Sequence, residues 1–149
     1  MYQKILVPLD GSPLAECALS EVRELAKGGL VGEVLLVNVI DTHRPSALAA
    51  EGIEISSSLE KAHRDRMQSY LAGVEQQFAS AGIPAKKISL EGDPAERILS
   101  YTREMGVNLI AIATHGHGGM RRLMFGSVAL RVLHDAPVPV LMIRPESCR

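Results

Sequence analysis

A glycine-rich loop followed by Gly126 and Ser127 is the part of the sequence best suited to binding chemistry. The segment 115–119 (HGHGG) holds three glycines, so its backbone can turn sharply and approach a ligand without side-chain obstruction. The apolar spacing over 128–134 predicts a helix that begins directly afterwards. Free N–H groups at the start of a helix, with the helix dipole behind them, attract anions such as phosphate. The segment therefore predicts a nucleotide phosphate site.

A second polar loop follows the first apolar run of the chain, residues 5–8 (ILVP). Asp10 and Ser12 come directly after this run. If the strands that precede the two loops are neighbours, Asp10 can hydrogen-bond a base or ribose while the glycine loop and Ser127 hold phosphates. The alternative is that Asp10 and Ser12 only cap the following helix and that the glycine loop only makes a turn. The spacing alone favours neither interpretation.

Alternating strands and helices must position these loops. The apolar runs predict strands over 5–8, 34–40, 86–90, 109–113 and 140–143. The helical periods and their start and stop residues predict helices over 13–27, 59–81, 94–105 and 128–134. This alternation indicates an α/β fold with a mainly parallel sheet. The segment 42–58 has no clear period and predicts a loop.

Length and composition restrict the class of protein. A chain of 149 residues with 46% hydrophobic and 22% charged residues indicates one globular domain over 1–149. A net charge of −1 and an aromatic content of 3% argue against nucleic acid as a partner. No apolar run reaches the roughly 20 residues that cross a bilayer. The N-terminus has no signal-peptide pattern, so we expect a cytoplasmic protein with no membrane partner.

The common phosphate-binding and metal-binding patterns are absent. Gly126 and Ser127 have no lysine between them, as the P-loop requires, and no G-x-G-x-x-G follows the first strand. His115 and His117 have no further ligand nearby in the sequence that would complete a metal site. Arginines 121 and 122 are either phosphate contacts or solvated residues of a helix surface. We therefore assign no catalytic residue and no metal ligand.

Several segments together resemble the universal stress protein family. They are VPLDGS at 7–12, ATHG at 113–116, GSVA at 126–129 and HDAPVPVLMIR at 134–144. Nucleotide-binding members of that family carry the pattern glycine, two residues, glycine, nine residues, glycine, serine. Gly116, Gly126 and Ser127 match this pattern, and Ala113 stands in the place of its first glycine.

The resemblance spans the chain and implies both a fold and a ligand. The fold is a three-layer, open, doubly wound sheet of five parallel strands in the order 3-2-1-4-5, with helices on both faces, a Rossmann-like adenine-nucleotide fold. The ligand is ATP, with or without Mg²⁺. The residues implied to contact it are Pro8, Leu9, Asp10, Val39, Ile112, Ala113, Gly116, Gly126, Ser127 and Val128. The first six border the base and ribose, and the last four meet the phosphates through backbone N–H groups and the serine hydroxyl.

The resemblance further implies a homodimer whose subunits meet along the last strand, 138–143. An apolar edge strand left exposed would favour aggregation, and a second copy of the chain packed against it would shield it from solvent. The function implied is ATP binding in a regulatory protein of stress adaptation, without strong catalytic activity. Two alternatives stay open. One is a nucleotide-free, partner-binding protein in which Ala113 marks a lost pocket, and the other is a slow ATPase in which Asp10 takes part.

Overall fold

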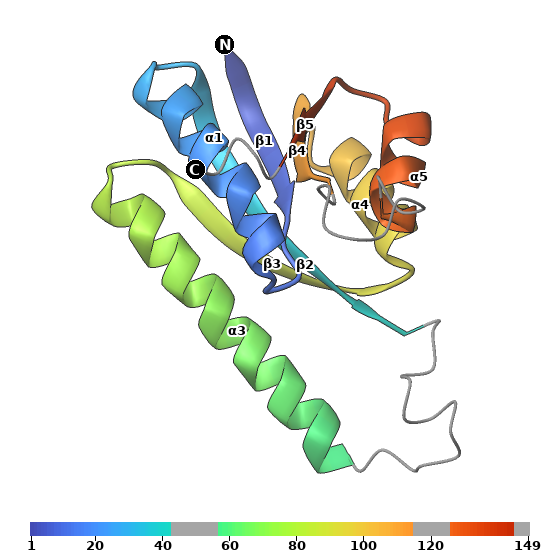
Figure 1. Cartoon of the computed structure of the whole chain (residues 1–149). Helices are drawn as coiled ribbons and strands as arrows, with labels where there is room; N and C mark the ends of the chain where they lie inside the picture. Colours follow the sequence, from blue (N-terminus) through green and yellow to red (C-terminus); the bar gives the residue numbers. More distant parts are fainter. Residues whose placement is uncertain (43–56, 115–125, 145–149) are drawn as a thin grey trace.

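A five-stranded parallel sheet forms the centre of the protein (Figure 1). The computed structural model describes residues 1–42, 57–114 and 126–144. The strands are β1 (Tyr2–Pro8), β2 (Val31–Asp41), β3 (Ala85–Gly92), β4 (Leu109–Ala113) and β5 (Val140–Ile143). They lie in the order β3-β2-β1-β4-β5, and every neighbouring pair is parallel. The predicted α/β class and strand order are therefore confirmed.

Helices cover both faces of this sheet. The described helices are α1 (Pro13–Lys27), α3 (Ser57–Ser80), α4 (Pro94–Glu104) and α5 (Ser127–Asp135). Helices α1 and α3 share one apolar core with Ile5 and Val7 of β1, whereas α4 and α5 share the other with Leu6. Successive side chains of a strand point to opposite faces. The central strands are continuous apolar runs because both of their faces are buried.

Helix α3 differs in part from its prediction. Met67 and Phe78 are buried as predicted, but Leu59 is 56% exposed and Ala81 lies outside the helix end. Every residue of 57–66 is exposed, because the start of α3 projects away from the body of the sheet (Figure 1). The amphipathic pattern places the inner face correctly, but this first part of the helix has no apolar surface to cover.

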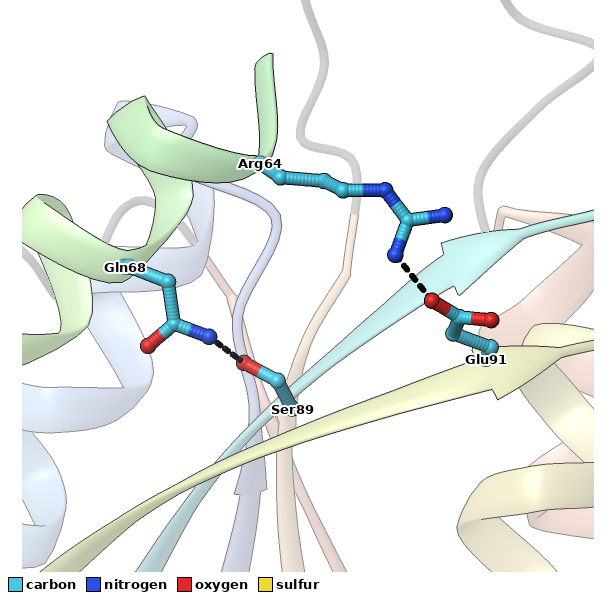
Figure 2. Close-up of polar contacts among 4 residues, drawn as sticks. All are labelled: Arg64, Gln68, Ser89 and Glu91. Atoms are coloured by element: carbon cyan, nitrogen blue, oxygen red, sulfur yellow. Dashed lines mark hydrogen bonds and ion pairs between the residues drawn. The ribbon is translucent and has the colours of Figure 1, made fainter. Parts of the chain in front are cut away.

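Two polar contacts join the first half of α3 to the edge strand β3 (Figure 2). Arg64 forms an ion pair with Glu91. One turn further along, the Gln68 side-chain amide donates a hydrogen bond of 2.7 Å to the Ser89 hydroxyl. All four side chains belong to residues that are exposed. Since exposed polar contacts stabilise a fold only slightly, the buried part of α3 supplies most of its attachment.

The close approach of β1 and β2 gives a test of the fold. A Cβ added at Gly32 would lie 2.7 Å from the backbone carbonyl oxygen of Gln3. The Gln3 carbonyl is part of the paired strand β1 and cannot rotate away from an added methyl group as a side chain could. We therefore expect Gly32→Ala to lower the free energy of unfolding by roughly 1–3 kcal/mol. Gly73 of α3 is the matched control, since a Cβ there meets nothing within 4 Å. Gly73→Ala is expected to raise stability by about 0.5–1 kcal/mol. Urea denaturation of both variants measures the difference, and equal stabilities would contradict the register of β1 and β2.

Candidate functional site

A cavity of about 490 Å³ lies at the carboxyl ends of β1, β2 and β4. Its walls come from these strand ends and from the first turns of α1, α4 and α5. The lining is mainly apolar, with polar side chains from Asp10, Ser12, Asn38 and Ser127. This combination of size, apolar walls and a few polar groups is typical of sites for small molecules.

The topology of the sheet explains why the cavity is there. β1 and β4 are neighbours, as the interpretation of the two polar loops requires. The chain leaves β1 toward α1 on one face of the sheet and leaves β4 toward α5 on the other. The connections therefore diverge beyond the strand ends, and a crevice opens at the point where the strand order reverses.

The structure brings the predicted site residues together wherever it describes them. Those that line the cavity are Pro8, Leu9, Asp10, Val39, Ile112, Ala113, Gly126, Ser127 and Val128. Gly116, together with His115, His117 and the two neighbouring arginines, lies outside the described residues. Ala113, which stands in place of the first motif glycine, is half-buried and lines the cavity.

The starts of three helices point their positive dipole ends toward this cavity. In α1, the Ser12 hydroxyl accepts a hydrogen bond of 3.2 Å from the backbone N–H of Ala15. In α4, the Asp93 carboxylate accepts one of 3.0 Å from the N–H of Glu96. In α5 the cap is Gly126, and among the described residues no side chain caps the helix. The first-turn amides of α5 are therefore the best placed to bind an anion.

Asp10 stabilises the turn that leads into α1 and also lines the cavity. Its Oδ1 accepts a hydrogen bond of 2.9 Å from the backbone N–H of Ser12, which stabilises the turn into α1. Asp10 is also exposed and lines the cavity. The turn thus fixes the position of a carboxylate at the mouth of the cavity, where it can accept hydrogen bonds from hydroxyl or amine donors.

Asn38 is a cavity residue that the sequence interpretation missed. It is only 6% exposed, and its side-chain N–H donates a hydrogen bond of 2.8 Å to the backbone carbonyl of Leu9. This bond ties the loop after β1 to β2, which positions Asp10 indirectly. The other side-chain atom, Oδ1, has no hydrogen-bond partner among the described residues. A lone amide within the apolar run 34–40 was the signal that could have identified it.

The apolar walls of the cavity also went unpredicted. They include Leu14, Ala15, Ile98 and Ala129. These residues lie on the inner faces of helices, and Ala15, Ile98 and Ala129 also belong to the two cores of the protein. No sequence signal separates such wall residues from core residues, because both satisfy the same helical period.

Within the three described ranges, no group of three or more histidine, cysteine, aspartate or glutamate side chains is arranged to hold a metal ion. Within the same ranges, none of the helices combines the length and the apolar character needed to cross a membrane.

Three comparisons relate this chain to known proteins. The model of the universal stress protein family matches residues 1–144. The universal stress protein MJ0531 of Methanocaldococcus jannaschii is 33% identical over 145 residues, which cover 97% of this chain and 83% of that protein. The solved structure of MJ0577, from the same organism, is 28% identical with a TM-score of 0.79, over 97% of this chain and 96% of that one. A universal stress protein from Archaeoglobus fulgidus, solved in complex with dAMP, is 23% identical with a TM-score of 0.65, over 95% and 98% of the two chains.

The phenol of Tyr70 gives a test of the packing between α3 and the start of α1. Burial raises the pKa of Tyr70 to about 12, and the nearby carboxylates of Glu16 and Asp10 add to the shift. The folded state therefore holds the proton more tightly than the unfolded chain, whose tyrosines ionise near pH 10. The stability that depends on this proton is complete below about pH 10 and is lost as the pH rises toward 12.

We expect the difference between the phenolate absorbance titrations of the wild type and Tyr70→Phe to show a midpoint near 12. The same difference measured in denaturant, as the control, should show a midpoint of about 10. A folded-state midpoint equal to the denatured one would mean that Tyr70 is not packed as described.

Proposed function

The chain belongs to the universal stress protein family, and from that premise we propose that it is an adenine-nucleotide-binding regulatory protein whose ligand is ATP. The observation that carries the proposal is the cavity of about 490 Å³ on which the starts of three helices converge. We take residues 1–149 as a single domain built around this site. The nucleotide-free alternative is less favoured, because the cavity is open although Ala113 replaces the first motif glycine.

The two ends of the cavity suit the two ends of a nucleotide. Near β1 and β2, the partly exposed apolar side chains of Pro8 and Val39 offer a surface for a flat base. Asp10 lies at the same end, where its carboxylate can accept hydrogen bonds from ribose hydroxyls. Near α5, the uncapped amides and the Ser127 hydroxyl are suited to phosphates. A nucleotide that lies across the carboxyl ends of β1 and β4 would therefore find suitable partners for its base, its ribose and its phosphates.

The ligand chemistry of relatives is only indirect support. The Archaeoglobus fulgidus protein was solved with dAMP, which is an adenine nucleotide. At 23% identity that likeness carries the fold and not the ligand. The proposal therefore depends on the cavity of this chain and on the residues that line it.

We propose binding as the main activity, with hydrolysis at most slow. In the described part of the cavity wall, Asp10 is the one side chain that titrates as an acid or base. It lies after β1, whereas the proposed phosphate end is at α5. A general base must lie within hydrogen-bond reach of the water that it activates. Asp10 is therefore better placed to bind the sugar than to activate a water beside the terminal phosphate.

Gly126→Val tests the phosphate end of the cavity. Gly126 has φ −52° and ψ 151°, a conformation that valine also adopts, so we expect α5 to begin as before. The branched side chain would cover the first-turn amides and should weaken ATP binding by about 10-fold to 100-fold, the loss expected from one or two charge-assisted hydrogen bonds. Calorimetric titration of nucleotide-stripped protein measures this change.

Leu133→Gln is the control for Gly126→Val, since Leu133 is an exposed residue of the same helix and does not line the cavity. We expect it to leave ATP affinity unchanged. Equal affinity in Gly126→Val and the wild type would mean that phosphates bind elsewhere. If the wild type gives no heat up to millimolar ATP, the partner-binding alternative takes the place of this proposal.

We also propose that two copies of the chain meet along β5. β5 is the last strand in the order of the sheet and pairs on one side with β4. Its residues Val140, Leu141 and Met142 are each partly exposed. An apolar edge strand with unpaired backbone groups is a site for pairing with another chain. A second copy related by a two-fold axis would cover it.

Leu141→Lys tests this interface. A buried charge without a partner strongly disfavours association, so the variant should sediment as a monomer or precipitate. Leu30→Lys is the control, because Leu30 is 45% exposed and lies before β2, away from β5. The control should keep the oligomeric state of the wild type. A dimer of unchanged stability in Leu141→Lys, measured by sedimentation velocity over a dilution series, would exclude the β5 interface.

A further inference from the structure

An ion pair stands at the rim of the cavity and joins two of the helices that form it. Nη1 of Arg131, on α5, lies 2.8 Å from Oδ2 of Asp93, the residue that caps α4. Asp93 directly precedes Pro94, which lines the cavity. The pair is therefore beside the proposed phosphate end, although neither of its members forms part of the wall.

The position of Arg131 on α5 directs it toward this end. Ser127 lines the cavity, and Arg131 follows it by four residues, so the two lie on one face of the helix. Helical side chains lean toward the N-terminus of their helix. The guanidinium extends from the second turn of α5 to Oδ2 of Asp93, at the rim of the cavity.

The pair is weakly held, and Asp93 has a second task. The Arg131 and Asp93 side chains are 49% and 33% exposed, and the contact between them is a single hydrogen bond. Exposed pairs of this kind stabilise a protein little. Oδ2 of Asp93 also accepts the N–H of Glu96, so Asp93 can cap α4 whether or not Arg131 is bound to it. Arg131 can therefore change partner without disturbing the start of α4.

We propose that Arg131 determines how the site distinguishes nucleotides by their number of phosphates, by exchanging Asp93 for the terminal phosphate of a nucleoside triphosphate. This inference rests on the proposed function. A guanidinium can bind phosphate oxygens through two parallel N–H donors. The contact with Asp93 uses only one such donor. In this arrangement a monophosphate occupies only the first turn of α5, and the two further phosphates of a triphosphate extend to the rim, where Arg131 contacts Asp93. Asp93 acts as the competitor that holds Arg131 when no triphosphate is present.

The competing interpretation is that the pair only fastens α5 to α4. The two interpretations predict opposite changes in ATP affinity when the charge of Asp93 is removed. If the pair is a fastener, removing either charge loosens the cavity and weakens every nucleotide alike. If Arg131 is a phosphate ligand, removing Arg131 weakens ATP selectively. Removing the charge of Asp93 then strengthens ATP binding, because a competitor and a repelling carboxylate are both lost.

The experiment compares Arg131→Gln and Asp93→Asn with the wild type, by calorimetric titration with ATP and with AMP. Asparagine caps helices as well as aspartate does, so Asp93→Asn keeps the start of α4. We expect Arg131→Gln to weaken ATP binding about tenfold, which corresponds to the loss of one exposed charge-assisted contact. The affinity for AMP should stay within about twofold of the wild-type value. We expect Asp93→Asn to bind ATP about threefold more tightly. Arg131→Lys, which keeps the charge but not the planar fork, should lie between Arg131→Gln and the wild type.

Arg103→Gln is the charge-matched control, since Arg103 is an exposed residue of the last turn of α4, at the end away from the cavity. It should change neither affinity. An equal loss for ATP and AMP in Arg131→Gln, or weaker ATP binding in Asp93→Asn, would overturn the inference and leave the proposed function standing. A wild type that binds neither nucleotide would overturn both.

Discussion

The burial of both faces of the central strands is the constraint on which the rest of the structure depends. In β1, Ile5 and Val7 need cover on one side and Leu6 on the other, and all three are completely buried. Right-handed crossovers place α1 and α3 on one face while the strands add outward from β1 to β3, and α4 and α5 on the other face once the strand order reverses. Since β1 and β4 are adjacent, α1 and α5 leave their shared end in different directions. The cavity is therefore a consequence of how the core is covered.

The sequence predicted those parts of the fold that depend on this burial. The bounds predicted for β4 and β5 agree with the structure, because each is an apolar run between turn residues. β2 begins at Val31, three residues before its prediction, because the register with β1 extends the pairing over residues that are only partly buried. Leu59 and Leu133 satisfy a helical period but are 56% and 43% exposed. A period identifies the side of a helix that can be buried, but not whether another element lies against it.

The candidate site was predictable to the extent that its residues differ from core residues. Asp10, Gly126 and Ser127 are polar or lack bulk at the ends of apolar runs, so their types and positions distinguish them. Ile98 and Ala129 are walls of the same cavity, yet each is also buried in the core beneath α4 and α5. Only the three-dimensional arrangement shows that one side of such a residue faces an open space. Asn38 lies between these cases, because an amide inside a buried strand is conspicuous but its partner, the Leu9 carbonyl, is 29 residues away.

The three helices that meet at the cavity do not offer the same chemistry. α1 and α4 begin with proline, which has no N–H to donate, and a side-chain oxygen occupies an amide in the first turn of each. α5 begins with serine after the cap residue Gly126, and no side chain of the described ranges caps it, so its first amides can bind an external acceptor. The positive ends of all three dipoles favour negative charge, but α5 is the helix best able to bind an anion directly. Charge selectivity at this site should therefore be a property of α5 and of the side chains that reach its first turn. The ends of β1 and β2, by contrast, contribute mainly apolar surface and a single carboxylate.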